Sequence, residues 1–276
     1  ADILDPMLCL VIALPAEARP LIAHYKLKGV DGHPYRLYTG DDLSLIVSGV
    51  GKIAAASAVA YQQALLTDLP AAWLNVGIAG HADAPLGTAL LAHKIVDAAS
   101  GKTFYPSFTS TPPCPTTLLN TVDQPETIYA NSCAYDMEAS GFCETAQRFA
   151  TGELVHCLKV VSDNPQYPLG DLNTKKVEQL ITAQQESIAV MGKALADLAR
   201  DLENLRADPP YLKEILARWR FTSTQRHQLR GLLRRWQILA PGQAVMDREL
   251  TSLPTRDEVL VIIERRLRDL DLSLTG

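Results

Sequence analysis

Apolar positions in the first part of the chain form short continuous runs that end where helical spacing begins. Residues 7–14 are an unbroken apolar run of strand length, which predicts a strand buried on both faces. Pro15 and Glu17 follow directly, and a proline in the first turn with an early carboxylate predicts a helix that begins there. The chain therefore starts as an α/β fold does, with a buried strand that leads straight into a helix.

Predicted strands and helices continue to follow one another over the next 150 or so residues. Residues 36–39 and 43–48 flank a Gly-Asp-Asp turn, which predicts a hairpin. The other elements that we expect, in chain order, are a helix at 53–66, strands at 72–76, 88–96 and 127–130, a helix at 138–150 and a strand at 153–162. Residues 97–126 have several prolines and no periodicity, so we expect a long loop there.

Glycine-rich segments follow two of the predicted strands. The stretch from Ser48 to Lys52 leads into a helix and can present backbone N–H groups to an anion or a sugar, but it lacks the spacing of a P-loop. The stretch from Gly77 to Gly80 is expected to be a tight turn that ends the strand at 72–76. Each glycine segment alone is weak evidence for a binding site.

The C-terminal part of the chain has helical spacing only. A long helix, capped by Asn173 or Thr174, is expected to run to about residue 205, where Pro209 and Pro210 interrupt the pattern. Amphipathic spacing then predicts three helices, at residues 211–221, 224–239 and 255–272. We therefore expect an α/β domain of residues 1–206 and a small helical C-terminal extension of residues 209–276.

Composition narrows the class of protein. The chain has 276 residues, of which 47% are hydrophobic and 21% charged, and this is ordinary for a globular protein. It has no apolar run near the roughly 20 residues that span a bilayer, and no basic segment before its first apolar run. Its five cysteines are scattered and form no CxxC pair. We expect buried thiols in a reducing cytoplasm, without a disulfide or a zinc site.

Charge is distributed unevenly along the chain. The net charge is −5, yet residues 207–276 carry 12 Lys and Arg against 9 Asp and Glu. The basic side chains of this segment are interleaved with acidic ones and form no block. We therefore expect neither nucleic acid nor a membrane as a partner.

Three carboxylates stand at strand ends, where α/β folds build their sites. Glu17 follows the first predicted strand, Glu138 lies where a short apolar strand turns into a helix, and Asp163 ends an apolar run before a loop. Each of them could instead be a helix cap or a partner of a helix dipole. The sequence segments around the three carboxylates help to decide between a functional site and a purely structural role.

Five segments, in this order, resemble the nucleoside phosphorylase/nucleosidase family; they are residues 13–17, 48–52, 75–80, 136–138 and 162–163. The order and spacing are most similar to the methylthioadenosine/S-adenosylhomocysteine nucleosidases and the hopanoid-associated nucleosidases. The resemblance covers roughly residues 7–200. It implies a three-layer α/β/α sandwich around a mixed, strongly curved sheet, in a protein that forms a homodimer.

The resemblance also implies roles for individual residues. Asp163 would protonate or hydrogen-bond N7 of adenine, and Ser162 would orient its carboxyl group. Glu138 would bind the ribose hydroxyls and stabilise a positively charged sugar, with Met137 packed under it. Glu17 would activate water. The chemistry implied is cleavage of the N-glycosidic bond of a purine nucleoside, which requires a protonated leaving group, a held sugar and an activated nucleophile.

The resemblance places the backbone around Val50, Ile78 and Ala79 on the walls of the sugar and base pocket. It implies a small-molecule nucleoside as substrate and no metal or organic cofactor. Lys159 stands where the adenosine-specific members often have arginine. The substrate loop before the Met-Glu motif is short here, and Tyr129 is our only candidate for the residue that stacks on the base.

The choice between hydrolysis and phosphorolysis depends on a phosphate site. Phosphorylases of this family have an arginine where this chain has Asn75 and a serine where it has Ile78. A phosphate without cationic partners binds poorly, so we favour water, although Arg19 and Arg36 could supply charge. A phosphorylase and a nucleoside-binding protein without turnover remain the alternatives to an adenine-releasing nucleosidase.

Overall fold

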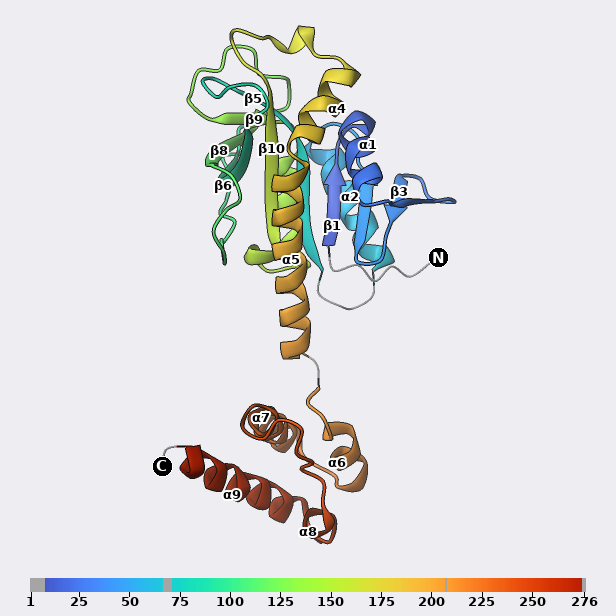
Figure 1. Ribbon diagram of the computed structural model, residues 1–276, viewed down its shortest axis with the longest axis vertical. Coiled ribbons are helices and arrows are strands. Elements are labelled where there is room, and N and C mark those ends of the chain that lie inside the picture. The colour runs from blue at the N-terminus through green and yellow to red at the C-terminus, as the bar shows by residue number, and fades with distance from the viewer. Residues whose placement is uncertain (1–7, 67–70, 207, 275–276) are drawn as a thin grey trace. The chain divides into compact units, whose positions relative to one another are not determined.

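The computed structural model describes residues 8–66, 71–206 and 208–274, and the chain divides into two compact units, residues 1–204 and 205–276. The first unit carries a large β-sheet covered by helices, and the second is helical (Figure 1). Each unit has a hydrophobic core of its own.

The elements of the first unit alternate as the sequence predicts. Its strands are β1 (Leu8–Ile12), β2 (Lys28–Val30), β3 (Arg36–Thr39), β4 (Leu43–Val47), β5 (Ala72–His81), β6 (Ala89–Asp97), β7 (Thr103–Phe104), β8 (Thr116–Thr121), β9 (Ala134–Asp136) and β10 (Val155–Asp163). Its helices are α1 (Pro15–His24), α2 (Lys52–Leu65), α3 (Ala139–Ala146), α4 (Thr174–Ala183) and α5 (Gln185–Arg206), with short 3₁₀ turns at Gly152–Leu154 and Leu169–Asp171.

All the described strands join one mixed sheet. Its order is β10-β6-β8-β9-β5-β1-β4-β3-β2, and β7 pairs with β6. Because β10 also pairs with β5, the strands β10, β6, β8, β9 and β5 close into a ring, which requires a strongly curved sheet. Three strands, β1, β5 and β10, run parallel side by side, so their carboxyl ends meet at one edge.

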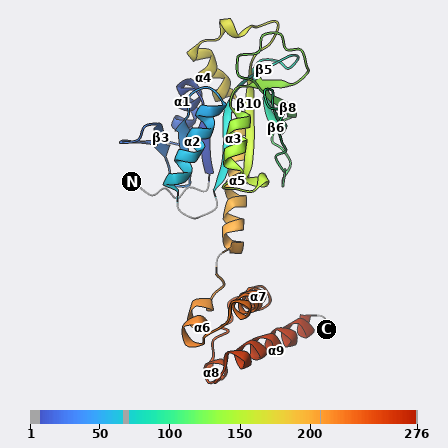
Figure 2. The same ribbon diagram turned by 180° about the vertical axis from the view of Figure 1, so that it is seen from behind.

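Helices cover both faces of the sheet. Leu10 of β1 points into a core with α1, α4 and α5, whereas its neighbour Val11 points into a second core with α2 and α3. Figure 1 shows α1, α4 and α5 on the near face, and Figure 2, from behind, shows α2 and α3 on the other. The predicted three-layer α/β/α sandwich with a mixed, curved sheet is confirmed.

The predicted turn from Gly77 to Gly80 is wrong, because β5 continues through it to His81. Both glycines are needed for room on the strand's surface. A Cβ atom on Gly77 would lie 3.0 Å from Glu17 Oε1, and one on Gly80 would lie 2.7 Å from Asp163 Oδ2. At both positions a carboxylate side chain lies against the strand where a Cβ atom would be, and no turn is involved.

Three other expectations differ from the structure. Residues 127–130 form no strand, and Tyr129 there has a left-handed backbone with φ of 51°. The loop expected over 97–126 contains β8, which pairs with β6 and β9. The single long helix is two helices, since α4 ends at Ala183 and α5 begins at Gln185. The expected cap is present, as the Asn173 side chain accepts a hydrogen bond from Lys176 N.

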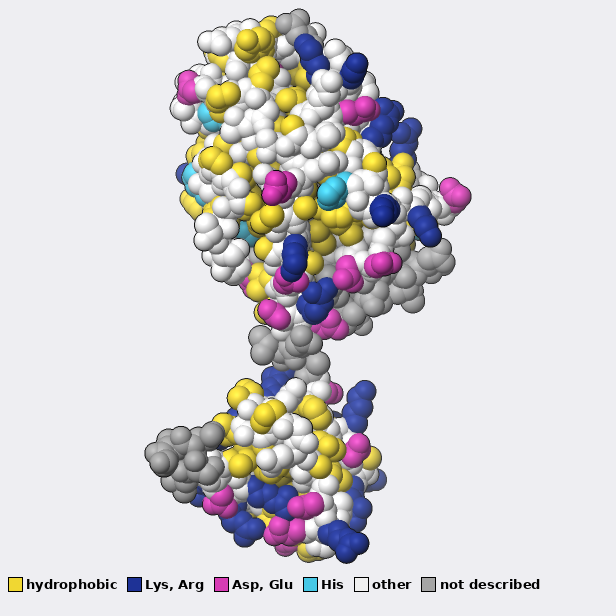
Figure 3. Space-filling model, viewed as in Figure 1, with side chains coloured by type: hydrophobic (Ala, Val, Ile, Leu, Met, Phe, Trp, Pro, Cys, Tyr) yellow, Lys and Arg dark blue, Asp and Glu magenta, His cyan; other side chains and the backbone are white. Residues whose placement is uncertain are grey.

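The second unit is a small helical bundle. Its helices are α6 (Leu212–Arg218), α7 (Ser223–Leu239), α8 (Arg248–Thr251) and α9 (Arg256–Leu274), so the sequence prediction of three helices missed only α8. Trp219 and Trp236 are buried in its core, and each indole N–H donates to a backbone carbonyl. On the face drawn in Figure 3, acidic and basic side chains of this unit are intermixed.

The close packing of α2 on α3 generates a stability prediction. A Cβ atom on Gly141 of α3 would lie 2.0 Å from the carbonyl oxygen of Lys52, the first residue of α2. Replacing glycine by alanine inside a helix normally stabilises it by up to about 1 kcal/mol. Gly141→Ala should instead destabilise the protein by about 1–3 kcal/mol, because the two helices must move apart.

Thermal denaturation compared with Gly152→Ala tests this expectation. The nearest atom to a Cβ on Gly152 is Ser107 Oγ at 3.8 Å, an ordinary contact, so this control should melt close to the wild type. Equal melting temperatures for Gly141→Ala and Gly152→Ala would contradict the close packing of α2 and α3.

Candidate active site

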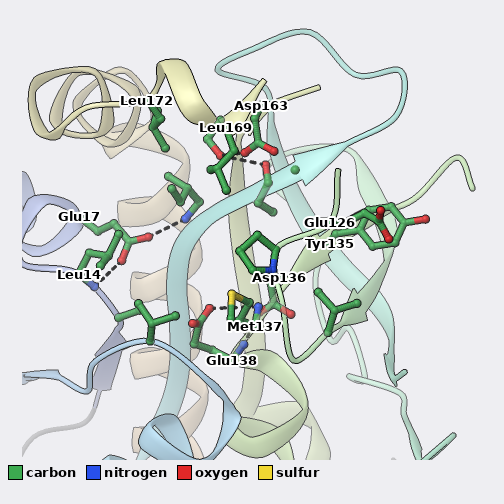
Figure 4. Close-up of a pocket in the computed structure, with 18 residues that line it drawn as sticks. Leu14, Glu17, Glu126, Tyr135, Asp136, Met137, Glu138, Asp163, Leu169 and Leu172 are labelled. Carbon is green, nitrogen blue, oxygen red and sulfur yellow. Dashed lines mark hydrogen bonds between the residues drawn. The ribbon is translucent and has the colours of Figure 1, made fainter. Parts of the chain in front are cut away.

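A cavity of about 250 Å³ opens at the carboxyl ends of β1, β5 and β10. Its volume lies just below the usual range for small-ligand pockets, roughly 300–1,000 Å³. All eight residues that the sequence assigned to a site line it: Glu17, Val50, Ile78, Ala79, Met137, Glu138, Ser162 and Asp163. Figure 4 shows Glu17, Glu138 and Asp163 on three different sides of this cavity.

Glu17 is held by two backbone amides from different elements. Its Oε2 accepts a hydrogen bond from Leu14 N at 2.7 Å, and its Oε1 accepts one from Ile78 N on β5 at 2.8 Å. The side chain is buried, and this burial raises its pKa to about 7, against the opposing effects of the Ile78 amide and the Lys159 charge. A carboxyl group with this pKa exchanges a proton readily at neutral pH.

Glu138 stands at the start of α3, where β9 turns into the helix. Its Oε1 accepts a hydrogen bond from Gly51 N at 2.9 Å. Gly51 has φ of 103°, a conformation that glycine adopts freely, so the turn before α2 aims its amide at the carboxylate. Burial raises the pKa of Glu138, the charge of Lys159 lowers it, and Asp136 raises it again.

A buried lysine lies beneath these carboxylates. Lys159 Nζ on β10 is 2.9 Å from Asp136 Oδ2 and 3.8 Å from Glu138 Oε2. It lies on the same face of β5 as Glu17, since a Cβ atom on Gly77 would lie 3.4 Å from Nζ and 3.0 Å from Glu17 Oε1. Burial lowers the pKa of Lys159, but the Asp136 and Glu138 carboxylates outweigh it and keep the pKa above its ordinary value.

Asp136 is fully engaged with its neighbours. Its Oδ1 accepts a hydrogen bond from Thr121 Oγ1, and its Oδ2 accepts one from Ala139 N in addition to the Lys159 contact. These bonds tie the end of β9 to β8, β10 and the first turn of α3. Asp136 therefore holds the strand-to-helix turn that carries Glu138.

Asp163 ends β10 and has a hydrogen bond on each carboxyl oxygen. Ser162 Oγ donates to Oδ1 at 2.5 Å, and the hydroxyl of Tyr129 donates to Oδ2. Asp163 is 4% exposed, and it reaches the cavity because β10 lies against Gly80 of β5. The carboxyl group is thus fixed at the wall that faces Leu169 (Figure 4).

The remaining walls of the cavity are mostly apolar. They come from the side chains of Leu14, Val50, Val122, Pro125, Met137, Leu169 and Leu172. Among the lining residues, all in the described part of the chain, none is lysine or arginine. Arg19 is paired with Glu178 at 2.6 Å and Arg36 is exposed on β3, so neither lines the cavity. The cavity therefore presents carboxylates, backbone amides and apolar surface.

Sequence reasoning missed several residues of this site. It noted Lys159 only as a replacement for arginine, yet a lysine inside an otherwise apolar strand signals a buried charge that needs carboxylate partners. Tyr129 was expected to stack on a base, and the structure places its hydroxyl on Asp163 instead. Leu169 and Leu172 come from the loop after β10, which carries no distinctive pattern.

Among the residues that the structure describes, no group of three or more His, Cys, Asp and Glu side chains is arranged to hold a metal ion. No helix in the described ranges is long and apolar enough to cross a bilayer. All five cysteines fall within those ranges and are free, and the closest sulfur atoms, those of Cys143 and Cys157, are 3.7 Å apart.

Solved structures share this fold, although no protein-family model and no curated protein matches the sequence. The 5′-methylthioadenosine nucleosidase of Arabidopsis thaliana superposes with a TM-score of 0.57 at 19% identity, over 71% of this chain and 97% of that one. The Helicobacter pylori 5′-methylthioadenosine/S-adenosylhomocysteine nucleosidase gives 0.56 at 13% identity, over 71% and 98%. Futalosine hydrolase of the same species gives 0.56 at 12% identity, over 70% and 97%.

The chain therefore has the fold of the nucleoside phosphorylase/nucleosidase family, as the sequence resemblance implied. The structures it resembles are matched over nearly their whole length, so the likeness concerns a complete fold and not a fragment of one.

The pKa of Glu17 generates a prediction about stability and pH. Its folded-state value of about 7 exceeds the ordinary value of 4.5, so between these values the folded protein binds more protons than the unfolded chain. Stability must therefore fall as pH rises through this window. Glu17→Gln removes the loss, and relative to wild type it should gain up to about 3 kcal/mol between about pH 4 and pH 8.

Chemical denaturation of both proteins across this pH range measures the difference. The constant offset caused by the altered hydrogen bonds to Leu14 and Ile78 cancels, because only the change with pH is compared. Parallel stability curves for the wild type and Glu17→Gln would contradict the raised pKa.

Proposed function

We propose that this protein hydrolyses the N-glycosidic bond of a purine nucleoside, an adenosine modified at its 5′ position, and releases adenine. The observation that supports it most is the meeting of Glu17, Glu138 and Asp163 at one cavity. They come from three different strand ends of a fold that nucleosidases share. A protein that only bound a nucleoside would have little need of three buried carboxylates, which are costly to place.

Each carboxylate has a distinct part in the proposed reaction. Asp163 delivers a proton to N7 of the purine, so the electron pair of the breaking C1′–N9 bond can pass to the base. Glu138 accepts hydrogen bonds from the ribose hydroxyls and stabilises the positive charge that develops on the sugar. Glu17 takes a proton from a water molecule as its oxygen bonds to C1′. The products are the free base and the free sugar.

Water suits this cavity better than phosphate as the nucleophile. Phosphate binds through cationic side chains and hydrogen-bond donors, and no Lys or Arg of the described chain lines the cavity. The nearest buried cation, Lys159, is already paired with Asp136 and lies against Gly77. Glu17, with a pKa near 7, is placed to accept a proton from water and would repel a phosphate.

The apolar wall supports a substrate with an apolar 5′ group. Leu14, Val50, Leu169 and Leu172 give this wall no hydrogen-bonding side chain, which would leave a free 5′ hydroxyl poorly satisfied. Two of the similar structures are nucleosidases named for 5′-methylthioadenosine. Residues 1–206 would form the catalytic domain and 209–276 a helical extension. The enzyme would act as a cytoplasmic homodimer without a metal or an organic cofactor.

Release of base in the presence and absence of phosphate tests the proposal. The panel contains methylthioadenosine, S-adenosylhomocysteine, 5′-deoxyadenosine, adenosine and inosine, with products separated by chromatography. We expect equal adenine release in both buffers and faster turnover of the adenosines that lack a free 5′ hydroxyl. Release that requires phosphate would identify a phosphorylase. Ligand-induced thermal stabilisation without any product would identify a binding protein instead.

Variants of the carboxylates separate the proposed roles. Asp163→Asn should lower kcat by roughly 10²–10⁴-fold while the protein stays folded, because the base then leaves unprotonated. Glu17→Gln should abolish hydrolysis and still bind the nucleoside detectably in a calorimetric titration. Turnover near the wild-type rate in either variant would remove that residue from the mechanism.

A further inference from the structure

Tyr129 lies outside the cavity and reaches Asp163, one of its lining carboxylates, from behind. Its side chain is 7% exposed and is not among the residues that line the cavity, yet its hydroxyl donates a hydrogen bond to Asp163 Oδ2. Its ring packs edge-on against Tyr135 at 6.0 Å between centroids, in a small cluster with Cys133. The phenol thus reaches the carboxylate from outside the cavity.

The hydrogen bond between Tyr129 and Asp163 needs room beside β5. A Cβ atom on Gly80 would lie 2.7 Å from Tyr129 Cε1 and 2.7 Å from Asp163 Oδ2. Any side chain at position 80 would therefore separate the phenol from the carboxylate. Gly80 has no positive φ and lies inside a regular strand, so this approach of two side chains is the reason the structure shows for a glycine there.

The backbone around Tyr129 directs its side chain toward Asp163. Tyr129 has φ of 51°, in the left-handed region that a bulky side chain adopts only under constraint. The carboxylate of Glu126 supplies that constraint, since its Oε1 accepts hydrogen bonds from Thr127 N at 2.9 Å, Ile128 N at 2.7 Å and Tyr129 N at 3.3 Å. These bonds lower the pKa of Glu126, chiefly through the Ile128 amide, so the carboxylate stays charged.

We propose that Tyr129 is a positioning residue that fixes the Asp163 carboxyl group toward the purine base. With Ser162 on Oδ1 and Tyr129 on Oδ2, the carboxyl plane is set by two donors and cannot rotate freely about its last side-chain bond. With Ser162 alone it would sample other orientations. The proposal rests on the proposed role of Asp163. It makes Tyr129 contribute to recognition of the base by orienting Asp163, whereas the sequence had suggested that Tyr129 stacks on the base.

Binding of adenine and 7-deazaadenine measures this role without turnover. The two bases differ only in the N7 atom, so the ratio of their dissociation constants reports how well Asp163 meets that atom. We expect the wild type to prefer adenine. Tyr129→Phe, which keeps the ring and removes the hydroxyl, should reduce that preference roughly tenfold. Its affinity for 7-deazaadenine should change little, whereas a general loss of structure would weaken both bases equally.

Two further variants complete the experiment. Asp163→Ala removes both carboxyl oxygens and reports the full value of the N7 contact, whereas the amide of asparagine could itself donate a hydrogen bond to N7. Tyr61→Phe is the matched control, because its hydroxyl bonds to His33 Nδ1 at 2.8 Å and Tyr61 does not line the cavity. Tyr61→Phe should keep the wild-type preference. Thermal melting of all three variants verifies that each is folded at the temperature of the titration.

The possible outcomes distinguish the two proposals. A wild-type preference for adenine that disappears in Asp163→Ala and persists undiminished in Tyr129→Phe would overturn the role of Tyr129 alone. A preference that is absent in the wild type, or that survives in Asp163→Ala, would overturn the assignment of Asp163 and with it the proposed function. Loss in both variants, with Tyr61→Phe unchanged, is the result that we predict.

Discussion

The site depends on one buried ammonium group. Lys159 Nζ lies against Gly77 of β5, 2.9 Å from Asp136 and 3.8 Å from Glu138, on the same face of the strand as Glu17 Oε1. Carboxylates held this close, out of water, repel one another and are costly to ionise. Breaking a buried ion pair typically costs about 3–5 kcal/mol, so the lysine is a condition for gathering these carboxylates at one cavity.

The same cation explains why the carboxylates are not equivalent. Asp136 takes the direct contact and three further hydrogen bonds, which suits a structural role in the turn before α3. The Lys159 ammonium group lies farther from Glu138 and Glu17, and burial still raises the pKa of both carboxyl groups. Geometry therefore separates a residue that holds the backbone from the two residues to which we assign water activation and sugar binding.

Much of this arrangement was predictable, and the exceptions have physical causes. The succession of apolar runs predicted the fold. The positions of Glu17, Glu138 and Asp163 at strand ends predicted a site, and the three carboxylates line one cavity. The strand β8 was missed because its buried positions include Thr117 and Thr121, and pairing with two neighbouring strands stabilises it more than its own composition. The glycines of β5 resembled a turn, since sequence alone does not show which side chains press on a strand.

The balance between burial and the Lys159 charge sets the protonation of Glu17, on which the proposed activation of water depends. A ¹³C NMR titration of the Glu carboxyl groups in labelled wild-type protein, with the Glu17 signal assigned from its loss in Glu17→Gln, measures this balance directly. The account predicts a pKa of about 7 for Glu17. A titration near the ordinary value of 4.5 would mean that Glu17 is not held in the dry, partly compensated environment described, and would contradict its place at the centre of the mechanism.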